Sequence, residues 1–237
     1  MRHGYISSMA ACRKIIALTA GLAALLRHDG PWAQASTRHA TALRSARHLG
    51  DRPGQAGALT NLGIVRWLTD DYTGAARDLE EALGISRDLG DRLGQAGALE
   101  YLGDVRQATG DYPGAARDLE EALGIFRDIG DRFGEVEVLN EAGTLRRVCD
   151  DLRQSGSCHQ QALDLARRID GARDEAHALA GLGRCALAAG HTGEAADMLR
   201  QALEIFQRIG AAEAADVAVE LGVLRAAAHP PPVESAE

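Results

Sequence analysis

Residues 53–92 read PGQAGALTNLGIVRWLTDDYTGAARDLEEALGISRDLGDR. Residues 93–132 follow without a gap and read LGQAGALEYLGDVRQATGDYPGAARDLEEALGIFRDIGDR. The two stretches are identical at 30 of their 40 positions. A fixed period in the range of about 20–50 residues is typical of solenoids, in which each unit buries its apolar face against the next unit. The sequence therefore predicts an array of 40-residue units.

Each unit is expected to contain two antiparallel helices. In residues 93–132, apolar side chains recur at helical spacing in both halves of the unit. Gly110 can end the first helix in a left-handed conformation, and Asp111 can cap the second helix. Glycine in a helix interior costs about 1 kcal/mol relative to alanine. Its recurrence at one place in each unit therefore predicts close helix–helix approach at Gly63, Gly103, Gly143 and Gly183.

The 40-residue frame extends in both directions from this pair of units. We expect an all-α, right-handed α-solenoid of five helix-turn-helix repeats, followed by a C-terminal capping helix with a polar outer face. The expected segments are an N-terminal extension (1–14), repeats at about 15–52, 53–92, 93–132, 133–172 and 173–212, the cap helix (213–228) and a disordered tail (229–237). The apolar run Ile15–Leu26 imitates a signal peptide, but it is in frame as the first helix of repeat one. At 12 residues it is too short to span a bilayer.

Composition excludes several classes of function. The net charge is −8 and no basic cluster is present, which argues against direct nucleic-acid binding. The sole lysine, Lys14, follows an arginine, so no Walker A loop exists. The sequence contains neither H-E-x-x-H nor G-x-S-x-G, and we expect neither an enzyme nor a cofactor.

The cysteines indicate a reducing, cytoplasmic environment. Their spacing is irregular and forms no C-x-x-C motif. Cys149, Cys158 and His159 match no zinc-binding spacing, so no metal site is expected. Cys185 falls on the predicted core side of its helix, where a free thiol packs as a small apolar group.

The repeat resembles the tetratricopeptide repeat (TPR). The small residue of that family's first helix, its aromatic residue at the turn and the Ala-x-x-x-Leu-x-x-Ala of its second helix stand here as Gly103, Tyr112, Ala115, Leu119 and Ala122. The same residue types recur 40 positions earlier. The resemblance covers about residues 15–228. Repeat four departs from it, because Leu152 replaces the aromatic residue and Ser155-Gly156 falls where the second helix should begin, so this junction is the expected hinge.

Strings such as LGDRPGQAGALTNLG and ALAGLGRCALAAG look like the C-terminal repeat region of large actinobacterial antibiotic-pathway regulators of the SARP type. The DNA-binding head and the nucleotide-binding switch domain of those regulators have no counterpart in this sequence. The resemblance implies a partner- or ligand-sensing segment of a transcriptional regulator, with a role in signal transduction. A stand-alone cytoplasmic scaffold or adaptor, and a receptor for a short signalling peptide, are the alternatives.

The first helices of such a solenoid line its concave face, where partners usually bind. Polar and aromatic side chains at the outward positions could satisfy the backbone of a protein or peptide, and carboxylates would favour a basic partner. A solvated helix face is the alternative interpretation. The candidate residues are Asn61, Ile64, Trp67, Glu100, Tyr101, Asp104, Gln107, Glu137, Asn140, Glu141, Arg147, His177 and Arg184.

Two further expectations concern surfaces. A column of arginines at 40-residue spacing is expected to pair with the Asp/Glu-rich second helices, for example with Glu80, Glu81, Glu120 and Glu121; its members are Arg66, Arg106 and Arg146. The apolar first helix, Ile15–Leu26, is expected to be covered by an upstream domain or by a second copy of the chain.

Overall fold

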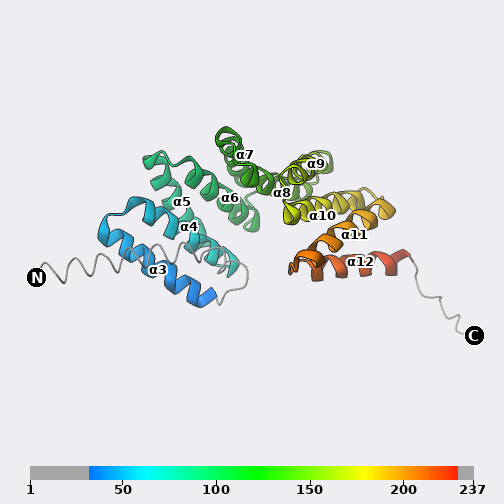
Figure 1. The fold of residues 1–237 in the computed structure, drawn as a ribbon, viewed down its shortest axis with the longest axis horizontal. Helices are drawn as coiled ribbons and strands as arrows, with labels where there is room; N and C mark the ends of the chain where they lie inside the picture. Colours follow the sequence, from blue (N-terminus) through cyan, green and yellow to red (C-terminus); the bar gives the residue numbers. More distant parts are fainter. Residues whose placement is uncertain (1–31, 229–237) are drawn as a thin grey trace, which may run out of the picture. The chain divides into compact units, whose positions relative to one another are not determined.

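The computed structural model describes residues 32–228, which form ten helices joined by short turns (Figure 1). No strand occurs within these residues. The expected N-terminal extension, the first helix of repeat one and the C-terminal tail lie outside the described residues. The all-α, helix-turn-helix repeat predicted from the 40-residue period is confirmed; the boundaries of the individual repeats remain predictions.

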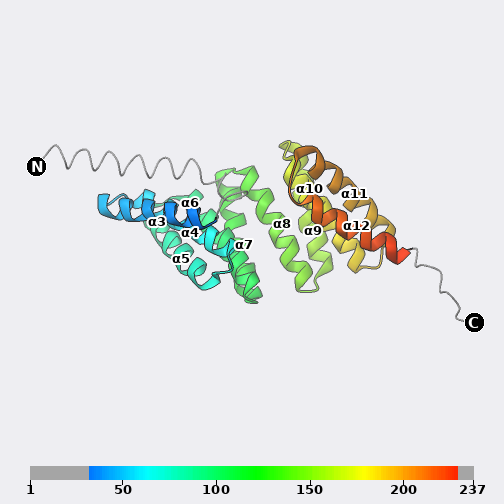
Figure 2. The same ribbon diagram turned by 90° about the horizontal axis from the view of Figure 1, so that it is seen from below.

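The chain divides into two compact units between Gly130 and Asp131. In the first unit the helices are α3 (Trp32–Leu49), α4 (Arg52–Leu68), α5 (Tyr72–Leu89), α6 (Arg92–Ala108) and α7 (Tyr112–Ile129). Each helix packs against the next one along the chain, and α4 also contacts α6 (Figure 2).

The second unit contains α8 (Arg132–Val148), α9 (Leu152–Arg168), α10 (Ala172–Ala188), α11 (Thr192–Ile209) and α12 (Ala214–Ala228). Consecutive helices again pack together, and α8 also contacts α10. Helix α9 begins at Leu152 and runs unbroken through Ser155 and Gly156. The division of the chain lies between Gly130 and Asp131, whereas the hinge expected near Leu152 stays a prediction.

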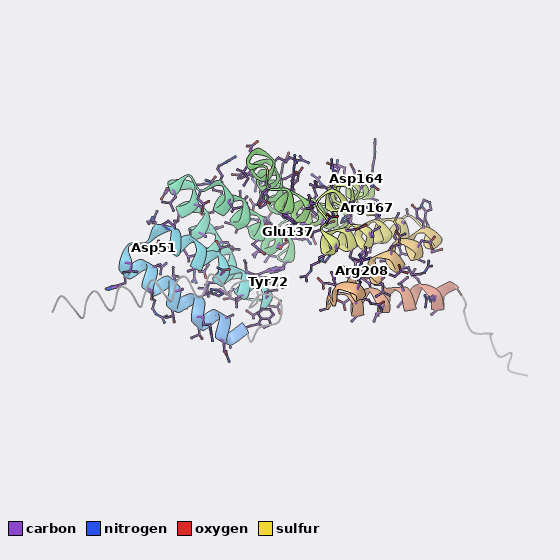
Figure 3. The ribbon with its side chains drawn as sticks, in the orientation of Figure 1. Asp51, Tyr72, Glu137, Asp164, Arg167 and Arg208 are labelled. Atoms are coloured by element: carbon purple, nitrogen blue, oxygen red, sulfur yellow. The ribbon has the colours of Figure 1, made fainter. Side chains whose placement is uncertain are left out.

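Aspartate side chains begin most of the helices. The Asp111 side chain accepts a hydrogen bond from the backbone N–H of Gly114 at 3.0 Å, and the same arrangement starts α4, where Asp51 is the cap (Figure 3). Gly110, with a φ of 83°, provides the left-handed residue between α6 and α7. These contacts satisfy backbone groups that a helix end otherwise leaves without a partner, and they confirm the predicted roles of Gly110 and Asp111.

The recurring glycines mark close contacts between the two helices of a repeat. A Cβ atom built on Gly63 would lie 2.6 Å from Cγ of Leu79, and one on Gly103 would lie 2.8 Å from Cγ of Leu119. Both leucines are fully buried or nearly so. The prediction of close helix–helix approach at these positions is confirmed.

The arginine column pairs with aspartates as well as glutamate. Arg66 donates a hydrogen bond to Asp78, and Arg106 donates one to Asp118, 12 residues further along the chain in both cases. Among the glutamates named above, Glu80 has its Oε1 atom 3.8 Å from Nη2 of Arg106. The expected pairing with acidic residues of the second helices is therefore confirmed for Arg66 and Arg106, although the main partners are aspartates and not the glutamates given as examples.

The last helix also differs from expectation. Glu213, which directly precedes α12, and Glu220 within it pair with arginines of α10, so these carboxylates face inward. Val219 and Val223 are 68% and 66% exposed on the other side of α12. The outer side of α12 is therefore mixed: Asp216 and Arg225 are exposed as expected, but Val219 and Val223 are exposed as well, and Glu213 and Glu220 are used within the second unit.

Candidate functional site

All the candidate residues lie on the first helices of the repeats. Helices α4 and α6 carry those of the first unit, and α8 and α10 carry those of the second. Because α4 contacts α6 and α8 contacts α10, each pair forms a continuous face within its own unit. Asn61, Trp67, Tyr101, Asp104 and Gln107 lie on α4 and α6, and we call the surface that they form the α4–α6 face.

An aromatic pair occupies the α4–α6 face. The ring centroids of Trp67 and Tyr101 are 6.2 Å apart and the rings are tilted by 58°. This geometry is in the favourable range for aromatic pairs, which hold each other in a fixed orientation. Both side chains are half-buried, so ring surface remains accessible. Aromatic side chains in this state are typical of protein-binding surfaces.

Asp104 lies one helical turn beyond Tyr101 on α6, and so on the same side of the helix. Its carboxylate makes no hydrogen bond or ion pair with the residues that the structure describes, although the residue is half-buried. Burial raises the pKa of Asp104 to about 7. A carboxylate in this condition gains from any cation that replaces the lost water.

Two candidates of the first unit are not accessible. Ile64 is 2% exposed and Glu100 is 5% exposed. Ile64 therefore belongs to the packing between helices, which differs from the expectation that it points outward. Asn61 and Gln107 are half-buried; the Asn61 amide donates to the carbonyl of Gly57 at 2.9 Å within α4.

In the second unit, Asn140 has a structural role. Its Nδ2 donates to the backbone carbonyl of Asp174 at 3.2 Å, which joins α8 to α10, and its Oδ1 lies 3.2 Å from Nδ1 of His159. His159 is 2% exposed and stands where Leu79 and Leu119 stand in earlier repeats. Its ring lies against Gly143, since a Cβ there would be 2.6 Å from Nε2.

The charge state of His159 follows from this environment. Burial lowers its pKa to about 4, with smaller contributions from the positive charges of Arg147 and Arg184. The ring is therefore neutral at pH 7, and its Nε2 has no hydrogen-bond partner within the described residues. The neighbouring Cys158 is half-buried and Cys149 is exposed, and no cluster of three or more His, Cys, Asp or Glu side chains that could hold a metal ion occurs among residues 32–228.

His177 and Arg184 on α10 are already engaged with the last helical segment. Nε2 of His177 lies 3.3 Å from Oε1 of Glu213, and its ring meets Phe206 edge-on at 5.1 Å. Burial lowers the pKa of His177, and Glu213 partly opposes this effect. Arg184 makes a two-point contact with Glu220, at 2.7 Å for its shortest distance. Sequence reasoning missed these partners, because it placed Glu213 and Glu220 on an outer face.

The remaining candidates of the second unit lie on α8. Glu137 is exposed (Figure 3), whereas Glu141 and Arg147 are half-buried. The structure thus brings Trp67 and Tyr101 into contact and leaves Asn61, Asp104 and Gln107 half-buried on the same two helices. Glu137, Glu141 and Arg147 lie on α8, and Asn140, His177 and Arg184 make contacts within the second unit.

The chain belongs to the tetratricopeptide repeat family. The family's sequence pattern matches residues 15–88, 59–128 and 134–208, which together cover most of the chain. No curated protein gives a significant sequence match. No helix among residues 32–228 has the length and apolar character needed to cross a membrane.

Solved structures share this fold at low sequence identity. BtubC from P. vanneervenii superimposes with a TM-score of 0.64 at 19% identity, covering 88% of this chain and 98% of that one. A signal transduction ATPase with a tetratricopeptide repeat sensor, from Pyrococcus horikoshii, gives 0.70 at 15%, covering 94% and 34% of the two chains. A Rap protein complexed with Competence and Sporulation Factor gives 0.68 at 14%, covering 91% and 64%. The TPR fold of this chain suggests protein–protein interaction.

Proposed function

We propose that the chain is a protein- or peptide-binding module whose partner docks on the α4–α6 face. The observation that carries this proposal is the half-buried Trp67–Tyr101 pair, which holds accessible aromatic surface in a fixed orientation on two neighbouring first helices. Such preorganised aromatic side chains contribute strongly to binding, because little side-chain entropy is lost when the partner arrives. We propose no catalytic role for any residue.

The charge of this region favours a basic partner. Asp104 lies beside the aromatic pair with no cation bound to it among the described residues, and the chain as a whole carries a net charge of −8. Complementary charge accelerates encounter and excludes acidic partners. On α8 of the second unit, Glu137 adds an exposed carboxylate to the accessible first-helix surfaces.

The biological setting that fits best is the sensing segment of a transcriptional regulator in the cytoplasm. The SARP-type sequence strings support it, and a tetratricopeptide repeat acts as the sensor in the Pyrococcus horikoshii ATPase that shares the fold. The Rap complex supports a second candidate, a receptor for a signalling peptide, because that relative was solved with such a factor. The two candidates use the same face.

Affinity purification from the native cells tests the binding proposal. The chain is compared with a Trp67→Ala, Tyr101→Ala double variant, and with an Arg77→Ala control that alters an exposed residue of α5. The proposal predicts one or more proteins retained by the wild type and the control and lost with the double variant. Equal retention by all three would contradict it, provided that circular dichroism shows all three folded.

The size of the endogenous protein tests the regulator setting. An immunoblot of native cells with an antibody against this chain distinguishes a product of 25.1 kDa from a larger one. A band several times heavier is expected for a sensor segment of a larger regulator. A band at 25.1 kDa would favour the stand-alone adaptor or the peptide receptor.

A further inference from the structure

We infer that the α4–α6 face contains a binding site for an arginine side chain of the partner, formed by Trp67, Tyr101 and Asp104. The inference rests on the proposed function, because it names the chemical group that the same face would recognise. It goes further by assigning the aromatic pair and the carboxylate to one guanidinium group.

The arrangement of the three side chains supplies the two contacts that a guanidinium group makes best. A planar guanidinium stacks on an aromatic ring, and Trp67 and Tyr101 leave ring surface accessible while they hold each other at 6.2 Å between centroids. Asp104, one turn from Tyr101, can accept two parallel N–H bonds from the same group. A cation over the rings therefore also reaches the carboxylate.

The state of Asp104 provides the driving force. In the first unit, two buried aspartates join the first helix of a repeat to the second, and each is paired with an arginine: Asp78 with Arg66 and Asp118 with Arg106. Asp104 has no such partner among the described residues, and its 40-residue counterparts in the frame are Ile64, Thr144 and Arg184. A half-buried carboxylate that has no cation beside it weakens the fold, so its presence one turn from an accessible ring favours a cation brought by a partner.

Arginine fits this site better than lysine does. The guanidinium group is more weakly hydrated than an ammonium group, so it is transferred to a half-buried site at lower cost. Its planar shape also allows stacking and bidentate hydrogen bonding at the same time, which a lysine cannot do. Gln107, one turn beyond Asp104, offers a further carbonyl oxygen on the same side of α6.

Tryptophan fluorescence tests the site directly. The chain has two tryptophans, so a Trp32→Phe background leaves Trp67 as the only reporter. The probes are N-acetyl-arginine amide, N-acetyl-lysine amide and N-acetyl-citrulline amide, the last being a neutral analogue of the same shape. The titrations are run at pH 8, where Asp104 is ionised, and at low ionic strength, where screening is weakest.

The inference predicts a saturable change in Trp67 fluorescence with the arginine probe, several-fold weaker binding of the lysine probe and no saturable response to citrulline. Asp104→Asn should weaken binding of the arginine probe about 10-fold or more, since a hydrogen bond to a charged acceptor is lost. Glu120→Gln, which removes an exposed carboxylate from α7 of the same unit, should leave it unchanged.

Equal responses to arginine and citrulline, or an unchanged response in folded Asp104→Asn protein, would overturn the inference. Affinity purification separates this failure from failure of the proposed function. A cellular partner that is lost with the Trp67→Ala, Tyr101→Ala variant but retained by Asp104→Asn would leave the binding face in place and remove the arginine site.

Discussion

Nη1 of Arg66 donates a hydrogen bond to Oδ2 of Asp78, which joins the first helix of a repeat to the second across 12 residues. The Asp78 side chain is only 5% exposed, whereas that of Arg66 is 25% exposed. Arg106 and Asp118 repeat the contact in the next unit of sequence. Repeat four has Arg146 but Cys158 at the aspartate position, so the carboxylate of this contact is missing there.

Asp78→Asn should destabilise the chain by about 2 kcal/mol, because it leaves the Arg66 guanidinium beside a buried neutral group. Glu81→Gln is the matched control, since Glu81 pairs with Arg47 at 2.7 Å but both side chains are about half exposed. That pair should contribute less than about 1 kcal/mol. Urea denaturation measures both variants, and equal effects would contradict the assignment of Arg66–Asp78 as the structural contact.

Glycine-to-alanine substitutions at two helix positions should change the stability of the chain in opposite directions. Gly103→Ala forces a methyl group against Leu119 and should destabilise the chain, by about 1–3 kcal/mol as for other overpacked cores. Gly124→Ala in α7 meets no atom within 4 Å and should stabilise it by up to about 1 kcal/mol. Thermal unfolding of the two variants checks the signs; a stabilising Gly103→Ala would show that the helices of the repeat do not approach closely there.

His159 should make the second unit sensitive to acid. Its folded-state pKa is about 4, below the ordinary histidine value of 6.5, so the unfolded chain takes up the proton first as the pH falls. Stability from this residue is present above about pH 6.5 and is lost between there and pH 4, with about 2 kcal/mol lost by pH 5. The His159→Leu variant carries the residue type that Leu79 and Leu119 supply in earlier repeats. Its melting temperature should therefore fall less than that of the wild type between pH 7 and pH 5.

Asp104 should make the first unit less stable as the pH rises, which is opposite to the effect of His159 on the second unit. Its folded-state pKa of about 7 lies above the ordinary aspartate value of 3.8, so the folded chain holds the proton more tightly than the unfolded chain. Stability from this group therefore falls as the pH rises from about 4 through 7. Asp104→Asn should raise the melting temperature most at pH 8, less at pH 5, and have little effect near pH 4. A variant that is less stable than the wild type at pH 8 would show that Asp104 is stabilised within the chain.

The 40-residue period was sufficient to predict the helices and the close contacts between the two helices of a repeat. Gly103 opposite Leu119, the αL glycine at 110 and the Asp111 cap all depend on residues near in sequence, for which local pattern and spacing are strong signals. The location of the candidate site on the first helices follows from the same frame.

Contacts across repeats could not be predicted in this way. The inward orientation of Glu213 and Glu220 depends on Arg173 and Arg184, 40 and 36 residues away, and charged residues were taken to face water. Likewise, the burial of Glu100 depends on how the neighbouring helices cover it, and its position on the helix resembles that of accessible Tyr101. The Arg66–Asp78 contact, in contrast, has a signal in the sequence. Residues of opposite charge stand 12 positions apart in both of the matching repeats, as Arg66 and Asp78 and as Arg106 and Asp118.

Site-directed photocrosslinking tests the central claim most directly. A benzoylphenylalanine residue is introduced in the native cells at Gln107, on the α4–α6 face, and separately at Glu120, on the exposed side of α7. The account predicts a specific crosslinked protein at position 107 that is absent at position 120 and disappears when Trp67 and Tyr101 are also replaced by alanine. Crosslinks of equal yield at both positions, or a crosslink at 107 that is unaffected by loss of the aromatic pair, would contradict it.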